Sequence, residues 1–141
     1  MPTRRAHAIW EGGLQGGKGS FEGESGAVSA SYSFGSRFGD AGGSNPEELL
    51  AAAEAACYSM ALSVGLEQAG HTGTRVRSDA ACTVEKQADG FKITGIKLKV
   101  RATVPGMDAA AFQQLAEATK AACPVSKALA AVPIELDAAL E

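Results

Sequence analysis

The feature that most constrains the fold is a long helix with almost no polar face, predicted over residues 45–70. Its start is well marked: Asn45 suits the N-cap, Pro46 is tolerated at the first helical position, and Glu48 is placed to complete a capping box. Beyond this start, apolar residues occupy nearly every side of the helix. A helix of this kind has to be covered on most sides, which predicts a central buried element with Cys57 in its middle.

The segments around this helix predict an α+β fold with mostly antiparallel strands. Residues 1–44 hold 11 of the 17 glycines, which indicates short strands over 6–10 and 19–22 and then a mobile loop with its tip at 31–39. Residues 74–87 and 91–104 predict a hairpin around Asp89-Gly90, with a β-bulge at Gly95. Asp108 is expected to cap a second helix, Pro124 to begin a short one, and residues 133–137 to form an edge strand.

Length and charge limit the classes of function. A chain of 141 residues predicts a single domain over 1–141, with strands and loop over 1–44 and the remaining elements over 45–141. The net charge of −3, without a basic stretch interleaved with aromatics, argues against nucleic-acid binding. The longest apolar runs are five residues each, which argues against a membrane span, and the absence of a signal-peptide core predicts a cytoplasmic protein.

The cysteines are candidates for metal binding or for reactive thiols, because three of them without a secretory signal do not predict a disulfide framework. With His7 and His71 they show no ligand spacing, so no metal site is expected. Cys123 precedes Pro124 as an N-cap, where helix-end N–H groups favour a thiolate.

Cys57 lies in the middle of the predicted helix, so no helix-end N–H groups stabilise its thiolate. Burial in an apolar helix also raises the pKa of a thiol. Cys57 needs a cation, and residues 38–74 contain neither lysine nor arginine. Arg37 is the nearest cation in sequence, and Glu47 is placed to hold it. Glu47 and Cys57 are separated by roughly 15 Å along the helix, so an extended arginine, or one from another chain, has to bridge part of that gap.

Several ordered motifs in this chain resemble the osmotically inducible protein C (OsmC) family, the sister of the organic hydroperoxide resistance (Ohr) proteins. The motifs are Trp10-Glu11-Gly12, Ser36-Arg37-Phe38, Asn45-Pro46-Glu47-Glu48-Leu49, Ala55-Ala56-Cys57-Tyr58-Ser59-Met60, Val104-Pro105-Gly106-Met107-Asp108 and Ala122-Cys123-Pro124-Val125-Ser126. They extend over nearly the whole chain.

The resemblance implies an intertwined homodimer with two central helices wrapped by antiparallel sheets, and a thiol peroxidase without metal or organic cofactor. It implies that Cys57 is the peroxidatic cysteine, Cys123 the resolving cysteine, Arg37 the activating arginine and Glu47 its partner. A Cys57 sulfenic acid then condenses with Cys123 to a disulfide, which a dithiol or lipoyl-type reductant reduces. An apolar mouth formed by Tyr58, Met60, Phe34 and Phe38 would favour organic hydroperoxides over hydrogen peroxide.

Glu54 departs from the family, whose similar members tend to carry histidine there. At three residues before Cys57 its carboxylate would disfavour the Cys57 thiolate, compete for Arg37, or point to a dimer interface instead. The same residues also allow a second interpretation, a non-catalytic stress protein that uses this fold to bind a ligand or partner. Cys82 shares the phase of Val76 and Val84, which favours a structural thiol in a strand.

Overall fold

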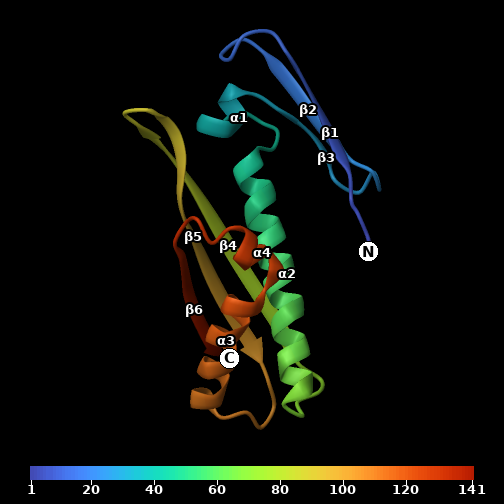
Figure 1. Ribbon diagram of the computed structural model, residues 1–141, viewed down its shortest axis with the longest axis vertical. Coiled ribbons are helices and arrows are strands. Elements are labelled where there is room, and N and C mark those ends of the chain that lie inside the picture. Colours follow the sequence, from blue (N-terminus) through green and yellow to red (C-terminus); the bar gives the residue numbers. More distant parts are fainter. The chain divides into compact units, whose positions relative to one another are not determined.

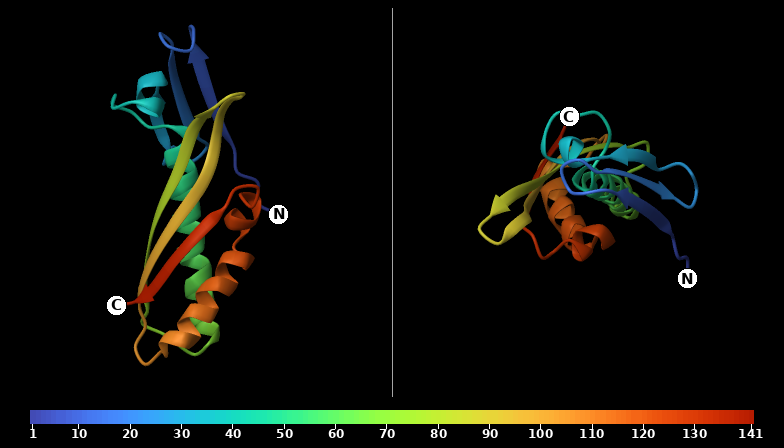
Figure 2. Two further views of the ribbon diagram at one scale, coloured as in Figure 1. Left: turned by 90° about the vertical axis from the view of Figure 1, so that its left-hand side faces the viewer. Right: turned by 90° about the horizontal axis from the view of Figure 1, so that it is seen from above.

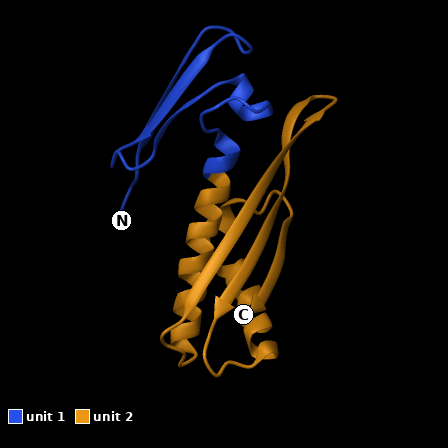
Figure 3. Ribbon diagram, turned by 180° about the vertical axis from the view of Figure 1, so that it is seen from behind, with its two compact units in different colours: residues 1–49 blue, residues 50–141 orange.

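The computed structural model describes residues 1–141. The chain divides into two compact units, residues 1–49 and residues 50–141, which Figure 3 colours separately. The single domain expected over 1–141 stays a prediction.

The first unit contains a three-stranded antiparallel sheet in the order β1-β2-β3, formed by Ala6–Glu11, Lys18–Gly23 and Ser29–Tyr32. The two strands predicted in this region are confirmed. The expectation of only a loop over 31–39 is wrong, because β3 reaches Tyr32 and a short helix α1 spans Phe34–Phe38. Ser33 and Ser36 form a capping box that starts α1, a local signal hidden among the surrounding glycines.

The long helix α2 spans Pro46–Gln68, close to its predicted limits. Asn45 caps it as expected, accepting a hydrogen bond from the Glu48 N–H at 2.8 Å. The Glu48 carboxylate accepts the hydroxyl of Ser44 instead of closing a capping box.

Only one side of α2 is buried in a single chain. The fully buried residues are four apart, at Glu54, Tyr58, Leu62 and Leu66, whereas Met60 is 72% exposed. The prediction of a helix covered on most sides is therefore not met within one chain.

By length and composition alone, α2 is long and apolar enough to cross a membrane. This corrects the expectation that no segment qualifies. The expectation was based on uninterrupted apolar runs, and Glu54 interrupts the apolar sequence of this helix. A core helix passes the same test, so the finding is weak grounds for a membrane segment.

The second unit contains a sheet in the order β4-β5-β6. Its hairpin is formed by β4, Arg75–Gln87, and β5, Gly90–Thr103, as predicted. The register shifts where Thr83 pairs with Gly95 and Val84 with Ile93, which confirms the β-bulge. The edge strand β6, Ile134–Leu140, pairs parallel to β5, so the sheet is not purely antiparallel.

Helices α3, Ala109–Ala122, and α4, Pro124–Ala128, connect β5 to β6. Asp108 caps α3 by accepting the N–H of Ala111, as predicted. Helices α2 and α3 cover the same face of the sheet (Figures 1 and 2). Side chains from these helices and from that sheet face form one apolar core, whose buried members are Tyr58, Leu62, Leu66, Leu98, Val100, Ala102, Val104, Phe112, Ala116, Cys123 and Ala138.

Candidate active site

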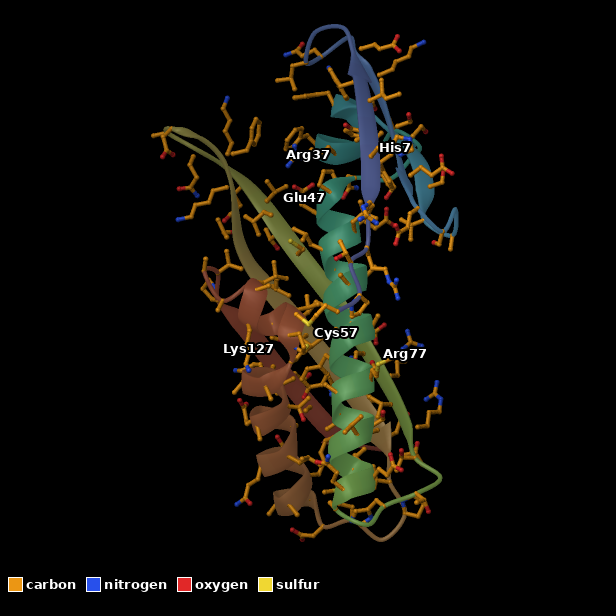
Figure 4. The ribbon with its side chains drawn as sticks, turned by 45° about the vertical axis from the view of Figure 1, so that its right-hand side comes forward. His7, Arg37, Glu47, Cys57, Arg77 and Lys127 are labelled. Carbon is orange, nitrogen blue, oxygen red and sulfur yellow. The ribbon has the colours of Figure 1, made fainter.

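In the first unit, Arg37 and Glu47 form the expected ion pair (Figure 4). Arg37 Nε lies 3.2 and 3.1 Å from the two carboxylate oxygens, and its Nη2 lies 2.7 Å from Oε1. Glu47 is 5% exposed. The pair is held in place by Asn45, whose amide donates to the Ser36 carbonyl at 3.1 Å and so ties α1 to the start of α2.

A pocket of about 300 Å³ lies beside Arg37 within this unit. The Arg37 guanidinium carbon is 5.2 Å from the centre of the Phe38 ring, a cation–π distance. Apart from Ser33, apolar and aromatic side chains line the rest of the pocket: Trp10, Leu14, Tyr32, Phe34 and Phe38. It thus combines one cation with an apolar wall.

In the second unit, Cys57 and Cys123 lie side by side with their sulfur atoms 3.2 Å apart. Both are free thiols; Cys57 is half-buried and Cys123 is fully buried. A disulfide has its sulfur atoms about 2.05 Å apart, so a small approach, together with the loss of two electrons and two protons to an oxidant, would join this pair covalently. Cys57 comes from the middle of α2 and Cys123 from the N-cap of α4.

The surroundings of the two sulfur atoms shift the pKa values of the two thiols in opposite directions. Burial raises the pKa of the Cys57 thiol; a hydrogen bond from the Val125 backbone opposes it, but Cys123 and the charge of Glu54 add to the rise. Burial acts upward on Cys123 too, but hydrogen bonds from Ser126 and Val125 outweigh it and lower the pKa of that thiol. The pKa of Cys123 is thus lowered in the expected direction, while its side chain makes no cap hydrogen bond at the start of α4. A thiolate at Cys57 needs a nearby cation to reverse this order.

Glu54 is completely buried in the second unit. Its Oε1 accepts the Ser126 hydroxyl at 2.5 Å, while its Oε2 has no hydrogen-bond partner. Of the three expectations for this residue, the disfavoured Cys57 thiolate agrees with the structure, in which burial raises the pKa of Cys57 and the charge of Glu54 adds to the rise. The other two are wrong: Arg37 pairs with Glu47, and Glu54 points inside its own chain instead of to an interface.

The expected apolar mouth is only partly present. Phe34 and Phe38 line the pocket of the first unit. Tyr58 is wrong as a mouth residue: it is fully buried, and its hydroxyl donates to the Ala116 carbonyl at 2.8 Å. Met60 is exposed. No group of three His, Cys, Asp or Glu side chains is placed to hold a metal ion.

Sequence reasoning missed Ser126 as a site residue. It noted the serine only as the end of the motif Cys123-Pro124-Val125-Ser126. The third residue after an N-cap points its N–H back at the cap, and this was the available signal.

Comparison with known proteins identifies the family of this chain. A family model described as OsmC-like protein matches residues 39–137. The chain is 45% identical over 129 residues to the peroxiredoxin OsmC of Escherichia coli (strain K12), covering 91% of this chain and 90% of that one. It is 35% identical over 126 residues to an organic hydroperoxide resistance protein of Xanthomonas axonopodis pv. citri (strain 306), covering 87% and 84%.

The fold agrees with these relatives. The crystal structure of the organic hydroperoxide resistance protein OhrB of Bacillus subtilis matches with a TM-score of 0.73 at 25% identity, covering 97% of this chain and 98% of that one. On the extent of the family match and of the identity, this chain belongs to the OsmC family.

Proposed function

We propose that this protein is a cysteine-based peroxidase that reduces organic hydroperoxides, and hydrogen peroxide less readily. The observation that carries the proposal is the pair of free thiols, Cys57 and Cys123, 3.2 Å apart in the interior of one unit. The names of the relatives, a peroxiredoxin and organic hydroperoxide resistance proteins, support the same chemistry.

The reaction starts with a Cys57 thiolate that attacks one oxygen of the peroxide bond. The bond breaks, the alkoxide leaves and takes up a proton to become an alcohol, and Cys57 becomes a sulfenic acid. Cys123 then attacks the Cys57 sulfur; a disulfide forms and water leaves. An external dithiol, or a lipoyl-type dithiol, returns both cysteines to thiols, so that no resident cofactor is needed.

Arg37 has the role of making Cys57 ionise. Within its own unit the pKa of Cys57 is raised, so the thiolate depends on a guanidinium supplied by this chain or by a partner chain. Glu47 accepts from Nε and Nη2 of Arg37 and holds the side chain in one orientation. Replacing Arg37 by Gln is expected to move ionisation of Cys57 to higher pH and to slow peroxide consumption.

The aromatic pocket beside Arg37 favours substrates with an apolar group, because burial of apolar surface contributes about 25 cal/mol per Å². Exposed apolar residues on the second unit's part of α2, Met60 and Val64 among them, support a homodimer that covers them. The protein is proposed to work in the cytoplasm.

The test is peroxide consumption with a dithiol, for wild type and three serine variants. Cys57→Ser should abolish turnover, and Cys123→Ser should abolish it or leave Cys57 oxidised without recycling. Cys82→Ser is the matched control and should turn over at a near-normal rate, because Cys82 lies half-buried in β4. Equal turnover of cumene hydroperoxide and hydrogen peroxide would contradict the proposed substrate preference.

One observation favours the second candidate, a non-catalytic binding or interaction module with this fold. Burial, with the charge of Glu54 adding to it, raises the pKa of Cys57, which is the wrong direction for a nucleophile. Undiminished peroxide consumption by Cys57→Ser, or none by wild type with several dithiols, would favour the module.

A further inference from the structure

Glu54 is a buried carboxylate that has no role in the reaction steps proposed above. It is 0% exposed, and Ser126 is its one hydrogen-bond partner, at 2.5 Å. Its second oxygen is buried without any partner. Leaving such an atom unpaired costs free energy, so packing alone is a poor explanation for a carboxylate at this position.

Ser126 connects this carboxylate to the thiol pair. It is 3% exposed and is the third residue after Cys123, the N-cap of α4, and its hydroxyl and N–H act to lower the pKa of the Cys123 thiol. Cys123 in turn lies 3.2 Å from Cys57. A hydrogen bond thus joins Glu54 to Ser126, Ser126 follows the N-cap Cys123 at the start of α4, and Cys123 lies beside Cys57, all inside the unit of residues 50–141. Figure 4 shows where Cys57 lies on α2.

The chemistry of a hydroxyl suits the middle of this chain. A serine has one proton to donate and two lone pairs that accept. While Ser126 donates to Glu54, it can accept from the thiol of Cys123. If the thiol proton moves to Ser126 as the serine proton moves to Glu54, the donor and the acceptor exchange roles in both hydrogen bonds. Protonated Glu54 then donates to Ser126, and Ser126 donates to the new Cys123 thiolate.

We propose that Ser126 and Glu54 form a proton relay that deprotonates Cys123 for its attack on oxidised Cys57. The inference rests on the proposed function, because it concerns the second step of that reaction. The Cys123 thiolate attacks the sulfur of the Cys57 sulfenic acid, the S–S bond forms, and the S–O bond breaks. The proton held by Glu54 returns to the departing oxygen, which leaves as water. Glu54 acts through Ser126 and is a positioning residue.

The relay has a cost in the first step. Glu54 lies three residues before Cys57, and its charge raises the pKa of that thiol. The ionisable groups on which Glu54 acts are Cys57 and Tyr58 on its own helix, and Cys57 in turn lies 3.2 Å from Cys123. Removing the charge of Glu54 should therefore act on the two steps in opposite directions, which a merely structural role would not do.

The experiment compares wild type with Glu54→Gln in single turnovers with cumene hydroperoxide and no reductant. We expect the pH profile of Cys57 ionisation to move to lower pH, and disulfide formation to slow about 100-fold, the low end of what a general base contributes. The lifetime of the sulfenic acid is measured by trapping with a dimedone reagent and by mass spectrometry. Glu67→Gln, on an exposed part of the same helix, is the control and should match wild type.

A second pair of variants keeps the test decisive if Glu54→Gln does not fold. Ser126→Ala should lengthen the sulfenic acid lifetime similarly, and Ser126→Thr, which keeps a hydroxyl, should restore fast disulfide formation. Disulfide formation at the wild-type rate in Glu54→Gln or in Ser126→Ala would overturn the relay. Wild type that forms no sulfenic acid at all refutes the proposed function itself, so the two failures are distinguishable.

Discussion

Replacing Arg37 and replacing Glu47 both break the ion pair between them, but the two replacements should lower the free energy of unfolding by different amounts. The Glu47 side chain is 7% exposed and the Arg37 side chain is 36% exposed. Removing Arg37 leaves a buried carboxylate without a counter-charge, whereas removing the charge of Glu47 leaves a guanidinium that water still reaches. The structure thus predicts that Arg37→Met destabilises more than Glu47→Gln.

The magnitudes follow from this difference in exposure. Losing the partner of a buried charge costs about 3 kcal/mol at the low end of the usual range. Losing the partner of a charge that stays solvated costs about 1 kcal/mol, as in exposed ion pairs. The ratio of the two costs, more than their absolute size, is the prediction.

The assay is chemical unfolding followed by the fluorescence of Trp10. It is the only tryptophan of the chain, and it lines the pocket beside Arg37 in the same unit, so its signal reports on unfolding of that unit. Arg5→Met is the matched control, because the Arg5–Glu24 pair is exposed and 3.8 Å apart, and it should leave the midpoint unchanged. Equal costs from the two ends, or a larger cost for Glu47→Gln, would refute the reasoning.

Three further predictions concern the second unit. Phe112→Ala should lower the free energy of unfolding by about 4 kcal/mol, because the ring is fully buried in the core; calorimetry measures it, and a cost under about 1 kcal/mol would contradict that packing. Tyr58→Phe should cost about 1 kcal/mol by removing the buried hydrogen bond to the Ala116 carbonyl, and a neutral result by denaturant unfolding would speak against that bond. Ser126→Ala removes a hydrogen bond that lowers the pKa of Cys123, so the ultraviolet absorbance of the thiolate should appear at higher pH; an unchanged titration would contradict the contact.

Elements marked by local chemistry were predictable from the sequence. Asn45 and Asp108 accept the N–H groups expected of N-caps, and Pro124 begins α4 where it should. The phase change at Gly95 located a bulge to within one residue, since Gly95 pairs with Thr83 and the register skips Thr94. In each case the signal lies within a few residues of the feature it predicts, so no knowledge of distant contacts is required.

Features that depend on distant contacts were not predictable in this way. The parallel pairing of β6 with β5 depends on where α3 and α4 carry the chain. The short helix α1 was hidden because its capping serines lie among glycines that favour a loop. Helical periodicity also left α2 without a preferred face, and packing decided that Tyr58 lies inside and Met60 outside.

The candidate site shows the same division. The Arg37–Glu47 pair was predictable from residue chemistry, and the neighbouring thiols were expected from the family resemblance. That Glu54 faces Ser126 was not, because a carboxylate in an apolar helix has several possible partners and only the fold selects one.

The measurement that tests the central claim most directly is the covalent state of the protein after one equivalent of organic hydroperoxide, without reductant. Peptide mapping by mass spectrometry should find an intramolecular disulfide between Cys57 and Cys123, formed at the same pace as the peroxide disappears. A protein that consumes peroxide while both thiols stay reduced, or that accumulates over-oxidised Cys57 with Cys123 untouched, would contradict the account.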